Sequence, residues 1–199
     1  SGMAGVPAFG GRGRPPGGGQ DGFASGDQYL YINGGYIAVN AGGDGLDVNG
    51  STEMTGGVVI VNGPIENMNG ALDSGSFTIS GGFLVAAGSA GMAESPDETS
   101  TQCSVLLNFG AAIRAGTLLY IESSDGQPVL TFAPAKQYET VVLSSPELER
   151  TTYNVYLGGD STGSARDGLY EGGTVSSGTN IGSFSISGTV TWVGGRYRR

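Results

Sequence analysis

The chain has 199 residues, with 39 glycines, one cysteine, no histidine and a net charge of −9 at neutral pH. This acidic balance excludes a nucleic-acid-binding surface, because such a surface must be basic to neutralise phosphates. No stretch approaches the ~20 apolar residues of a transmembrane helix, so we expect no membrane span. The glycines follow no Gly-X-Y period, which excludes collagen. The start at Ser1 leaves open whether the chain is a processed product or a fragment of a longer protein.

Residues 1–26 form a glycine- and proline-rich arm that cannot bury enough apolar surface to fold alone. We predict that this arm lies against its own domain or against a neighbouring chain. Five arginines make both ends of the chain basic: Arg12, Arg14, Arg196, Arg198 and Arg199. On an acidic protein they predict an assembly contact with the acidic face of a neighbour, with solubility as the alternative role.

Residues 27–100 carry a repeat marked by three glycine pairs, Gly34-Gly35, Gly56-Gly57 and Gly81-Gly82, at spacings of 22 and 25 residues. Each pair follows an alternating segment and precedes an apolar one, and no helical pattern lies between them. A repeat of this length built of strands predicts a parallel β-helix. Because side chains alternate along a strand, aligning the pairs predicts two inward columns, Leu30/Thr52/Phe77 and Ile32/Met54/Ile79.

The segments after the glycine pairs, such as residues 58–61, are apolar at every position. A strand that is apolar on both faces is buried on both. We therefore expect the C-terminal region, or alternatively a partner subunit, to cover this side of the repeat.

Residues 101–199 predict further strands that complete the same domain. They cover residues 104–109, 117–122, 128–132, 140–143, 153–157 and 183–193. The sequence SSDG from Ser123 predicts a hairpin turn. Because GSFTISG at Gly75 and GSFSISG at Gly182 are nearly identical, the last strand is expected to return to the repeat. Residues 144–152, with a proline near their start, predict one helical turn.

Four motifs resemble those of a known family: GGDGLDVNG at 42–50, GALD from Gly70, LLNF from Leu106 and FAPAK from Phe132. The family consists of secreted bacterial carbohydrate-binding domain-containing proteins with a polysaccharide-lyase-like right-handed β-helix. The resemblance covers roughly residues 27–195. It implies an all-β, right-handed parallel β-helix with bound calcium and affinity for plant-type or acidic polysaccharides, outside the bacterial cell or on its surface. Family members usually carry further coils before the glycine-rich segment, so we expect the first coil here to lack a cap.

Asp44, Asp47 and Asp73 are the candidate metal ligands, with Asn49 and Asn69 completing the shell. Asp44 and Asp47 flank one corner of the predicted coil, and Asp73 falls at the equivalent place one repeat later. In stacked repeats, equivalent residues lie about 4.8 Å from one another. Carboxylates at such a short distance repel each other, and a hard cation such as Ca²⁺ bound between them removes this repulsion. The alternative is that aspartate simply suits glycine-flanked turns through side-chain hydrogen bonds to the backbone. The resemblance favours calcium.

Tyr29 and Tyr31 alternate with the inward Leu30 and Ile32, so they are expected to face outward, and Glu53 points the same way from the next repeat. Outward tyrosines can stack on sugar rings, or they can pack against the arm or another subunit. Packing is favoured, because aromatic side chains dominate the energetics of burial.

Catalysis is not expected. Lys136 is the only lysine, and the chain lacks histidine, the usual acid–base residue, so we predict no polysaccharide lyase activity. Cys103 is expected to be a buried, inert thiol and Trp192 a core residue.

The sequence thus predicts an extracellular, non-catalytic, polysaccharide-binding β-helix stabilised by calcium. The competing hypothesis is a structural subunit of an extracellular filament or lattice, in which residues 1–26 contact the next protomer. Unpaired backbone at an open end of stacked strands favours such association.

Overall fold

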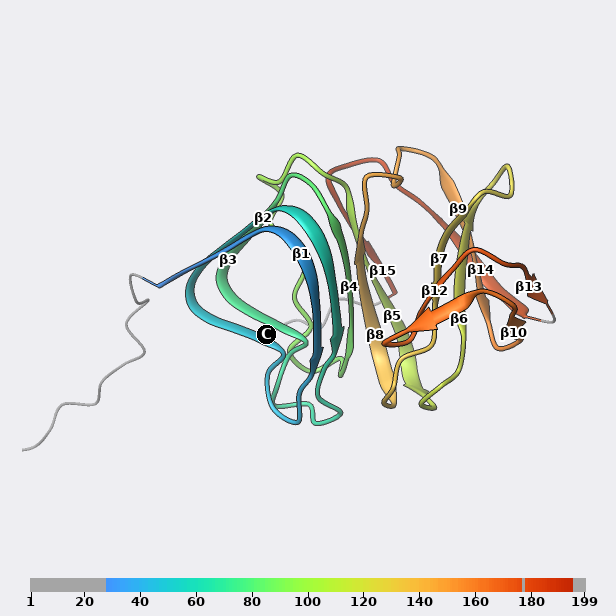
Figure 1. Cartoon of the computed structure of the whole chain (residues 1–199), viewed down its shortest axis with the longest axis horizontal. Coiled ribbons are helices and arrows are strands. Elements are labelled where there is room, and N and C mark those ends of the chain that lie inside the picture. Colours follow the sequence, from blue (N-terminus) through green and yellow to red (C-terminus); the bar gives the residue numbers. More distant parts are fainter. Residues whose placement is uncertain (1–27, 177, 195–199) are drawn as a thin grey trace, which may run out of the picture.

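The structure is a computed structural model that describes residues 28–176 and 178–194, and these residues form an all-β fold (Figure 1). The first eight strands are β1 (Tyr29–Asn40), β2 (Leu46–Asn62), β3 (Leu72–Ile79), β4 (Phe83–Gly88), β5 (Ser104–Ile113), β6 (Leu119–Ser123), β7 (Pro128–Phe132) and β8 (Tyr138–Ser144). The other seven are β9 (Thr152–Leu157), β10 (Asp160–Ser161), β11 (Ser164–Arg166), β12 (Leu169–Glu171), β13 (Val175–Ser176), β14 (Thr179–Ser185) and β15 (Val190–Val193). No helix in this part of the chain is long and apolar enough to cross a membrane.

The parallel region, β1 to β4, begins the larger sheet, which we call sheet A. Sheet A has the order β1-β2-β4-β8-β5-β15, with β3 beside β2. The long strands β1 and β2 bend at their glycine pairs, so the first half of β2 pairs with β3 and its second half with β4 (Figure 1). The register predicted from the glycine pairs is confirmed: both inward columns are aligned across β1, β2 and β3.

The stacking of one bend on the next explains the glycines. Gly57 and Gly82 each have a φ of 92°, in the left-handed region that favours glycine. In addition, a Cβ at Gly82 would lie 2.7 Å from the carbonyl oxygen of Gly57, and a Cβ at Gly81 would lie 2.4 Å from that of Thr55. Any larger residue would push the stacked strands apart.

The predicted right-handed parallel β-helix is wrong, although the all-β class is right. β8 runs antiparallel between β4 and β5, which makes sheet A a mixed sheet. The physical reason is that the glycine-pair repeat, which imposes parallel stacking, ends after Gly82. Beyond it the chain passes through β5, β6 and β7 before β8 returns, in the opposite direction, between β4 and β5.

A second sheet, sheet B, has the order β11-β12-β7-β6-β9-β14 and is antiparallel throughout. The SSDG hairpin turn is confirmed, since Gly126 N donates to the Ser123 carbonyl at 2.9 Å between β6 and β7. The expected returning strand over residues 183–193 is wrong as one element, because β14 joins sheet B and β15 joins sheet A. Residues 145–151 form turns and bends rather than the expected helical turn.

Two apolar cores lie on opposite sides of sheet A. The inner core fills the space enclosed by the bent strands: Ile32, Met54, Val59, Val61, Ala71, Leu72, Phe77, Ile79, Leu84, Ala86, Leu106 and Val142. The intersheet core lies against sheet B and includes Ile60, Val85, Leu119, Ile121, Phe132, Tyr138, Val141, Leu143, Tyr153 and Phe184. The expectation that the C-terminal region covers the doubly apolar strands is therefore confirmed. Trp192 is partly buried against the inner core, whereas Cys103 is half-buried rather than buried.

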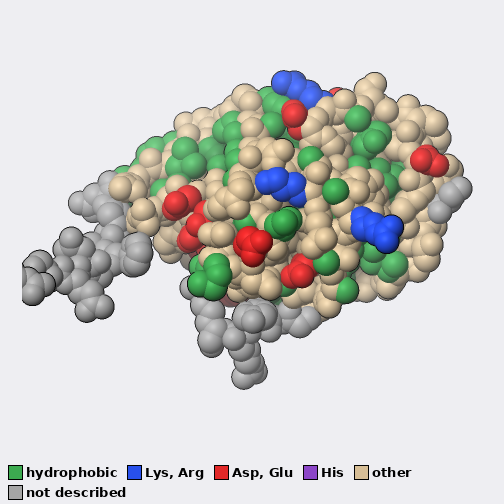
Figure 2. All heavy atoms as spheres, turned by 90° about the horizontal axis from the view of Figure 1, so that it is seen from below, with side chains coloured by type: hydrophobic (Ala, Val, Ile, Leu, Met, Phe, Trp, Pro, Cys, Tyr) green, Lys and Arg blue, Asp and Glu red, His purple; other side chains and the backbone are tan. Residues whose placement is uncertain are grey.

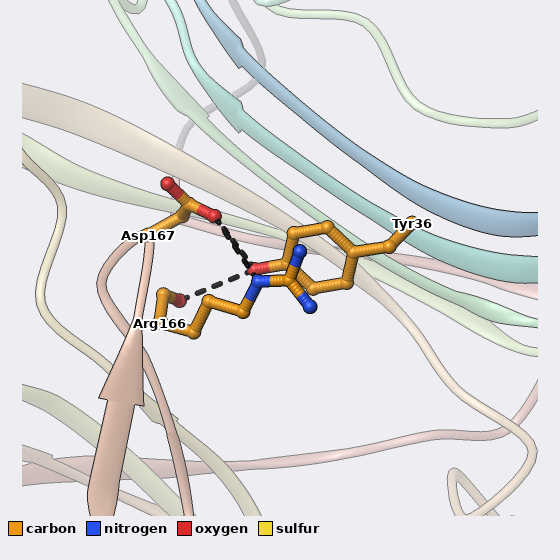
Figure 3. A network of polar contacts seen from close by, with 3 residues as sticks. All are labelled: Tyr36, Arg166 and Asp167. Carbon is orange, nitrogen blue, oxygen red and sulfur yellow. Dashed lines mark hydrogen bonds and ion pairs between the residues drawn. The ribbon is translucent and has the colours of Figure 1, made fainter.

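Polar contacts join sheet B to the parallel region at β1 (Figure 3). Tyr36 on β1 donates a hydrogen bond to Asp167 at 2.9 Å, and the Arg166 guanidinium lies 3.6 Å from the centre of the Tyr36 ring. Burial and the hydrogen bond to the Asp167 carboxylate raise the pKa of Tyr36. The turn between β11 and β12 is thereby held against the side of β1 that faces sheet B.

The two ends of the parallel region differ. At the β3 end, the Asp97 carboxylate accepts a hydrogen bond from Phe77 N at 2.9 Å, and Ser100 Oγ accepts one from Ile79 N at 3.0 Å. Side chains from the segment after β4 thus cap the edge of β3. At the other end, β1 has only β2 as a strand partner among the described residues.

Candidate functional site

The predicted metal ligands lie in the parallel region, but they have different surroundings. Asp47 and Asp73 are directly opposite each other on β2 and β3, as the repeat predicted. Asp44 Oδ1 instead accepts a hydrogen bond from Gly70 N at 2.7 Å, which is the role of an aspartate in a turn. Asn49 is exposed and Asn69 is half-buried. Within the described ranges no three His, Cys, Asp or Glu side chains are grouped to hold a metal, so calcium binding stays a prediction.

The predicted tyrosine surface is outward-facing. Tyr29 and Tyr31 are 62% and 60% exposed, and their rings stack at 6.2 Å with an angle of 14°. Glu53 lies opposite Tyr31 on β2 and is exposed. The structure therefore brings these three residues together on the outside of the parallel region.

The remaining predicted residues divide into two groups. Lys136 donates a hydrogen bond to the Ala41 carbonyl, and next to it Ala135 N donates to Asn62 Oδ1 at 2.7 Å. Lys136 thus has a structural contact between the loop before β8 and the parallel region. The predicted assembly residues lie outside the described part of the chain: Arg12, Arg14, Arg196, Arg198 and Arg199.

Sheet B carries a further candidate site that the sequence patterns did not indicate. Its outer face has a row of side chains that crosses the strands at one level. The pairings align Ala165 with Tyr170, Thr131 with Tyr120, Tyr120 with Tyr156, and Tyr156 with Asn180. We call Tyr170, Thr131, Tyr120, Tyr156 and Asn180 the tyrosine row. The strand neighbours of the three tyrosines and Thr131, such as Leu119, Ile121 and Leu169, belong to the intersheet core, so these four residues face away from it.

Two tyrosines of the row are held by one carboxylate. Tyr120 donates to Glu122 Oε2 at 2.9 Å, and Tyr156 donates to Glu122 Oε1 at 2.8 Å. Their ring centres are 5.7 Å apart, with an angle of 42° between the planes. Partial burial, followed by the hydrogen bond to Glu122, raises the pKa of Tyr120 to about 12. The two rings are therefore fixed side by side without losing their access to solvent.

A groove continues from one end of the row. It has a volume of about 560 Å³, and its lining includes Tyr120, Thr131 and Tyr170. Glu147 and Glu171 also line it, so two carboxylates lie beside the aromatic rings. A groove with aromatic walls and a few polar groups is typical of sites for small or extended ligands.

The face shown in Figure 2 carries both acidic and basic side chains on a mostly uncharged surface. Such a distribution does not favour a polyanionic partner on this face.

The tyrosine row could have been found only in part from the sequence. Alternation in Leu119-Tyr120-Ile121-Glu122 predicts that Tyr120 and Glu122 share a face. However, Tyr156 meets them only because β9 pairs with β6, and local sequence contains no signal for that pairing.

Comparison of the chain with protein-family models, with curated proteins and with solved structures finds no match. The chemistry of the site is therefore the basis for assigning a function.

Proposed function

We propose that this protein binds polysaccharide chains, without catalysis, through the tyrosine row on sheet B. The observation that carries the proposal is the shared anchoring of Tyr120 and Tyr156 by Glu122. Aromatic rings that are already fixed lose little conformational freedom when a ligand covers them, which favours affinity.

The row matches the surface of a sugar. A pyranose ring has a face of C–H groups, which stacks on an aromatic ring, and a rim of hydroxyl groups, which form hydrogen bonds. Tyr120, Tyr156 and Tyr170 supply the rings, and Thr131 and Asn180 supply polar groups at the same level. Because neighbouring strands lie about 4.8 Å apart, a row across five strands extends for about 20 Å. That length suits a linear chain of several sugars rather than a single one.

The charge of the site narrows the choice of glycan. Glu122 lies on the same face as the row and contacts two of its hydroxyl groups, and Glu147 and Glu171 line the groove. These carboxylates repel the uronate groups of acidic polysaccharides, so we propose a neutral plant-type glycan as the ligand. The proposed setting is extracellular or at the bacterial cell surface, as the sequence resemblance implies.

The test is retardation of the protein in gels that contain a soluble neutral glucan, xylan or mannan, compared with polygalacturonate, each with calcium or with a chelator. We expect retardation by at least one neutral polymer, with or without the chelator. Replacing both tyrosines in Tyr120→Ala/Tyr156→Ala should weaken binding at least about 30-fold, the effect of losing a binding hot spot.

The matched control is Tyr29→Ala/Tyr31→Ala, which removes two stacked tyrosines from the parallel region. This variant should bind as the unchanged protein does. If the two double variants lose binding equally, or if the sheet B variant binds normally with an unchanged circular dichroism spectrum, the tyrosine row is not the site. Binding to polygalacturonate alone would refute the preference for neutral chains.

Self-assembly is a second candidate function, and the outer edge of β1 is the observation that favours it. We propose it as an alternative to, or in addition to, glycan binding. The predicted contact through residues 1–26 lies outside the described residues, whereas the edge of β1 lies within them.

A further inference from the structure

The outer edge of β1 is long and has no strand partner among the described residues. β1 extends over 12 residues, and its only neighbour in sheet A is β2. A strand edge of this length presents a row of backbone N–H and C=O groups that can pair with another strand. The opposite end of the parallel region is different, because Asp97 and Ser100 cap the edge of β3.

Gly34 provides an independent observation at the same edge. At the equivalent position of the next strands, a Cβ on Gly56 would lie 3.0 Å from the carbonyl oxygen of Asn33, and a Cβ on Gly81 would lie 2.4 Å from that of Thr55. The Cβ direction at this position therefore points toward the preceding strand.

At Gly34 a Cβ would meet no described atom within 4 Å, and its φ is not in the left-handed region. Glycine weakens a strand relative to residues with a side chain. The described residues give no reason for glycine here, whereas a backbone lying against the open edge would give one.

We propose that a second copy of this chain pairs with β1 in the antiparallel sense, around a twofold axis between Gly34 and Gly35. These two glycines are at the midpoint of β1 (Tyr29–Asn40). The axis therefore places the bend of one β1 strand on the bend of the other, and both halves of the strand can pair.

The side-chain faces also agree across this axis. Ile32 comes to lie opposite the partner's Ile37, and Leu30 opposite the partner's Val39. In each protomer these four residues belong to or pack against the inner core. A register shifted by one residue would instead place inner-core side chains beside outward ones. The twofold register thus extends the inner core from one protomer into the next.

The proposed contact covers apolar surface that the monomer leaves partly open. Leu30, Ile37 and Val39 are only partly buried, although they line the end of the inner core. Tyr29 and Tyr31 flank the edge and are exposed. A twofold contact uses the same surface on both subunits and is closed, so it predicts a dimer rather than a filament.

The test is sedimentation equilibrium of the full chain over a range of concentrations. We expect a mass of twice the 20.0 kDa of one chain. In Gly34→Val the new side chain meets no described atom of its own protomer, but it points into the twofold contact. We expect this variant to associate at least about tenfold more weakly, with an unchanged circular dichroism spectrum.

The matched control is Gly43→Val, because a Cβ at Gly43 also meets nothing within 4 Å and this glycine lies beyond the end of β1. It should dimerise as the unchanged chain does. Hydrogen exchange of the peptide covering residues 29–40 should become slower as the concentration rises, and Gly34→Val should remove this effect. A monomer at all concentrations, a dimer that Gly34→Val leaves intact, or a series of larger oligomers would each overturn the proposal.

Discussion

The parallel region and sheet B keep their strands in order by different means. In the parallel region the backbone of one strand lies on the backbone of the next, and glycine is required where they touch, as at Gly57 and Gly82. In sheet B the turn between β6 and β7 contains a glycine with open surroundings, Gly126, where a Cβ would meet nothing within 4 Å. Gly126 therefore serves only the conformation of its turn, whereas Gly57 and Gly82 also allow the close approach of the next strand.

The two regions also present their tyrosines differently. Tyr29 and Tyr31 come from one strand and stack on each other. Tyr120 and Tyr156 come from neighbouring strands, and Glu122 fixes both hydroxyl groups. Exposed aromatic residues are thus not equivalent candidates for binding, because only the second pair is held in place by a third side chain.

The two regions should differ most in how much free energy of unfolding is lost when a glycine with a left-handed backbone conformation is replaced by alanine. Gly126→Ala should lower the free energy of unfolding by about 1–2 kcal/mol, the cost of a left-handed conformation for a residue with a Cβ. Gly82→Ala carries that cost and also a clash with the Gly57 carbonyl, so we expect a loss of about 3 kcal/mol or more. Denaturant unfolding of both variants measures the difference. Equal losses would show that stacking does not require glycine at this position.

A smaller effect is expected from the turn aspartates. Asp44→Ala leaves the buried Gly70 N–H without its acceptor, which should cost about 1–2 kcal/mol. Asp44→Asn keeps an oxygen acceptor for Gly70 N, so it should lower the free energy of unfolding by less than about 0.5 kcal/mol. Asp125→Ala, at the exposed hairpin of sheet B, should have an equally small effect.

The same variants test the calcium prediction. If Asp44, Asp47 and Asp73 hold Ca²⁺, the ion should raise the melting temperature of the unchanged chain, and Asp44→Asn should reduce that rise. If the unchanged chain and Asp44→Asn respond identically to calcium and to a chelator, Asp44 does not bind the ion and serves only as the hydrogen-bond acceptor for Gly70 N.

A further expected effect is a loss of stability at alkaline pH, to which tyrosines of both sheets contribute. Burial raises the pKa of Tyr138 and Tyr153, and it raises that of Tyr120 to about 12 from 10.0. The folded chain therefore binds these protons more tightly than the unfolded chain. The stabilisation is complete below pH 10 and is lost as the pH rises toward 12 and above.

Denaturant unfolding at increasing pH, followed together with tyrosinate absorbance, measures this loss. Tyr120→Phe should make the alkaline decline shallower, because it removes one group whose pKa is raised by folding. An unchanged decline in this variant would contradict a contribution of Tyr120.

Local sequence predicted the order of the parallel region and failed at pairing over longer distances. The columns through Ile32 and Phe77 were correct because glycine pairs and side-chain alternation are local signals. The two copies of GSF(T/S)ISG show the limit. Phe77 and Phe184 are both buried, yet Phe77 lies in parallel β3 and Phe184 in antiparallel β14. The shared sequence determines which side chains are buried but not which strand lies beside them.

The candidate site obeys the same rule. The outward direction of Tyr29 and Tyr31 could be predicted, because it depends on alternation alone. The meeting of Tyr156 with Glu122 depends on the β6–β9 pairing, which joins segments 34 residues apart. The candidate site on sheet B therefore depends on the part of the topology that local sequence does not determine.

The position of β8 sets the order in which the chain can be completed during synthesis. β4 and β5 are both made before β8, yet β8 is the strand that joins them. Translation proceeds at roughly 5–20 residues per second, so the edge of β4 stays unpaired for a time on the order of seconds until β8 has been made. Throughout that interval the doubly apolar strands, with Ile60 and Val85, have no second sheet to cover them. Until β8 is made the nascent chain therefore exposes the edge of β4, and its apolar face stays uncovered until the later strands of sheet B follow.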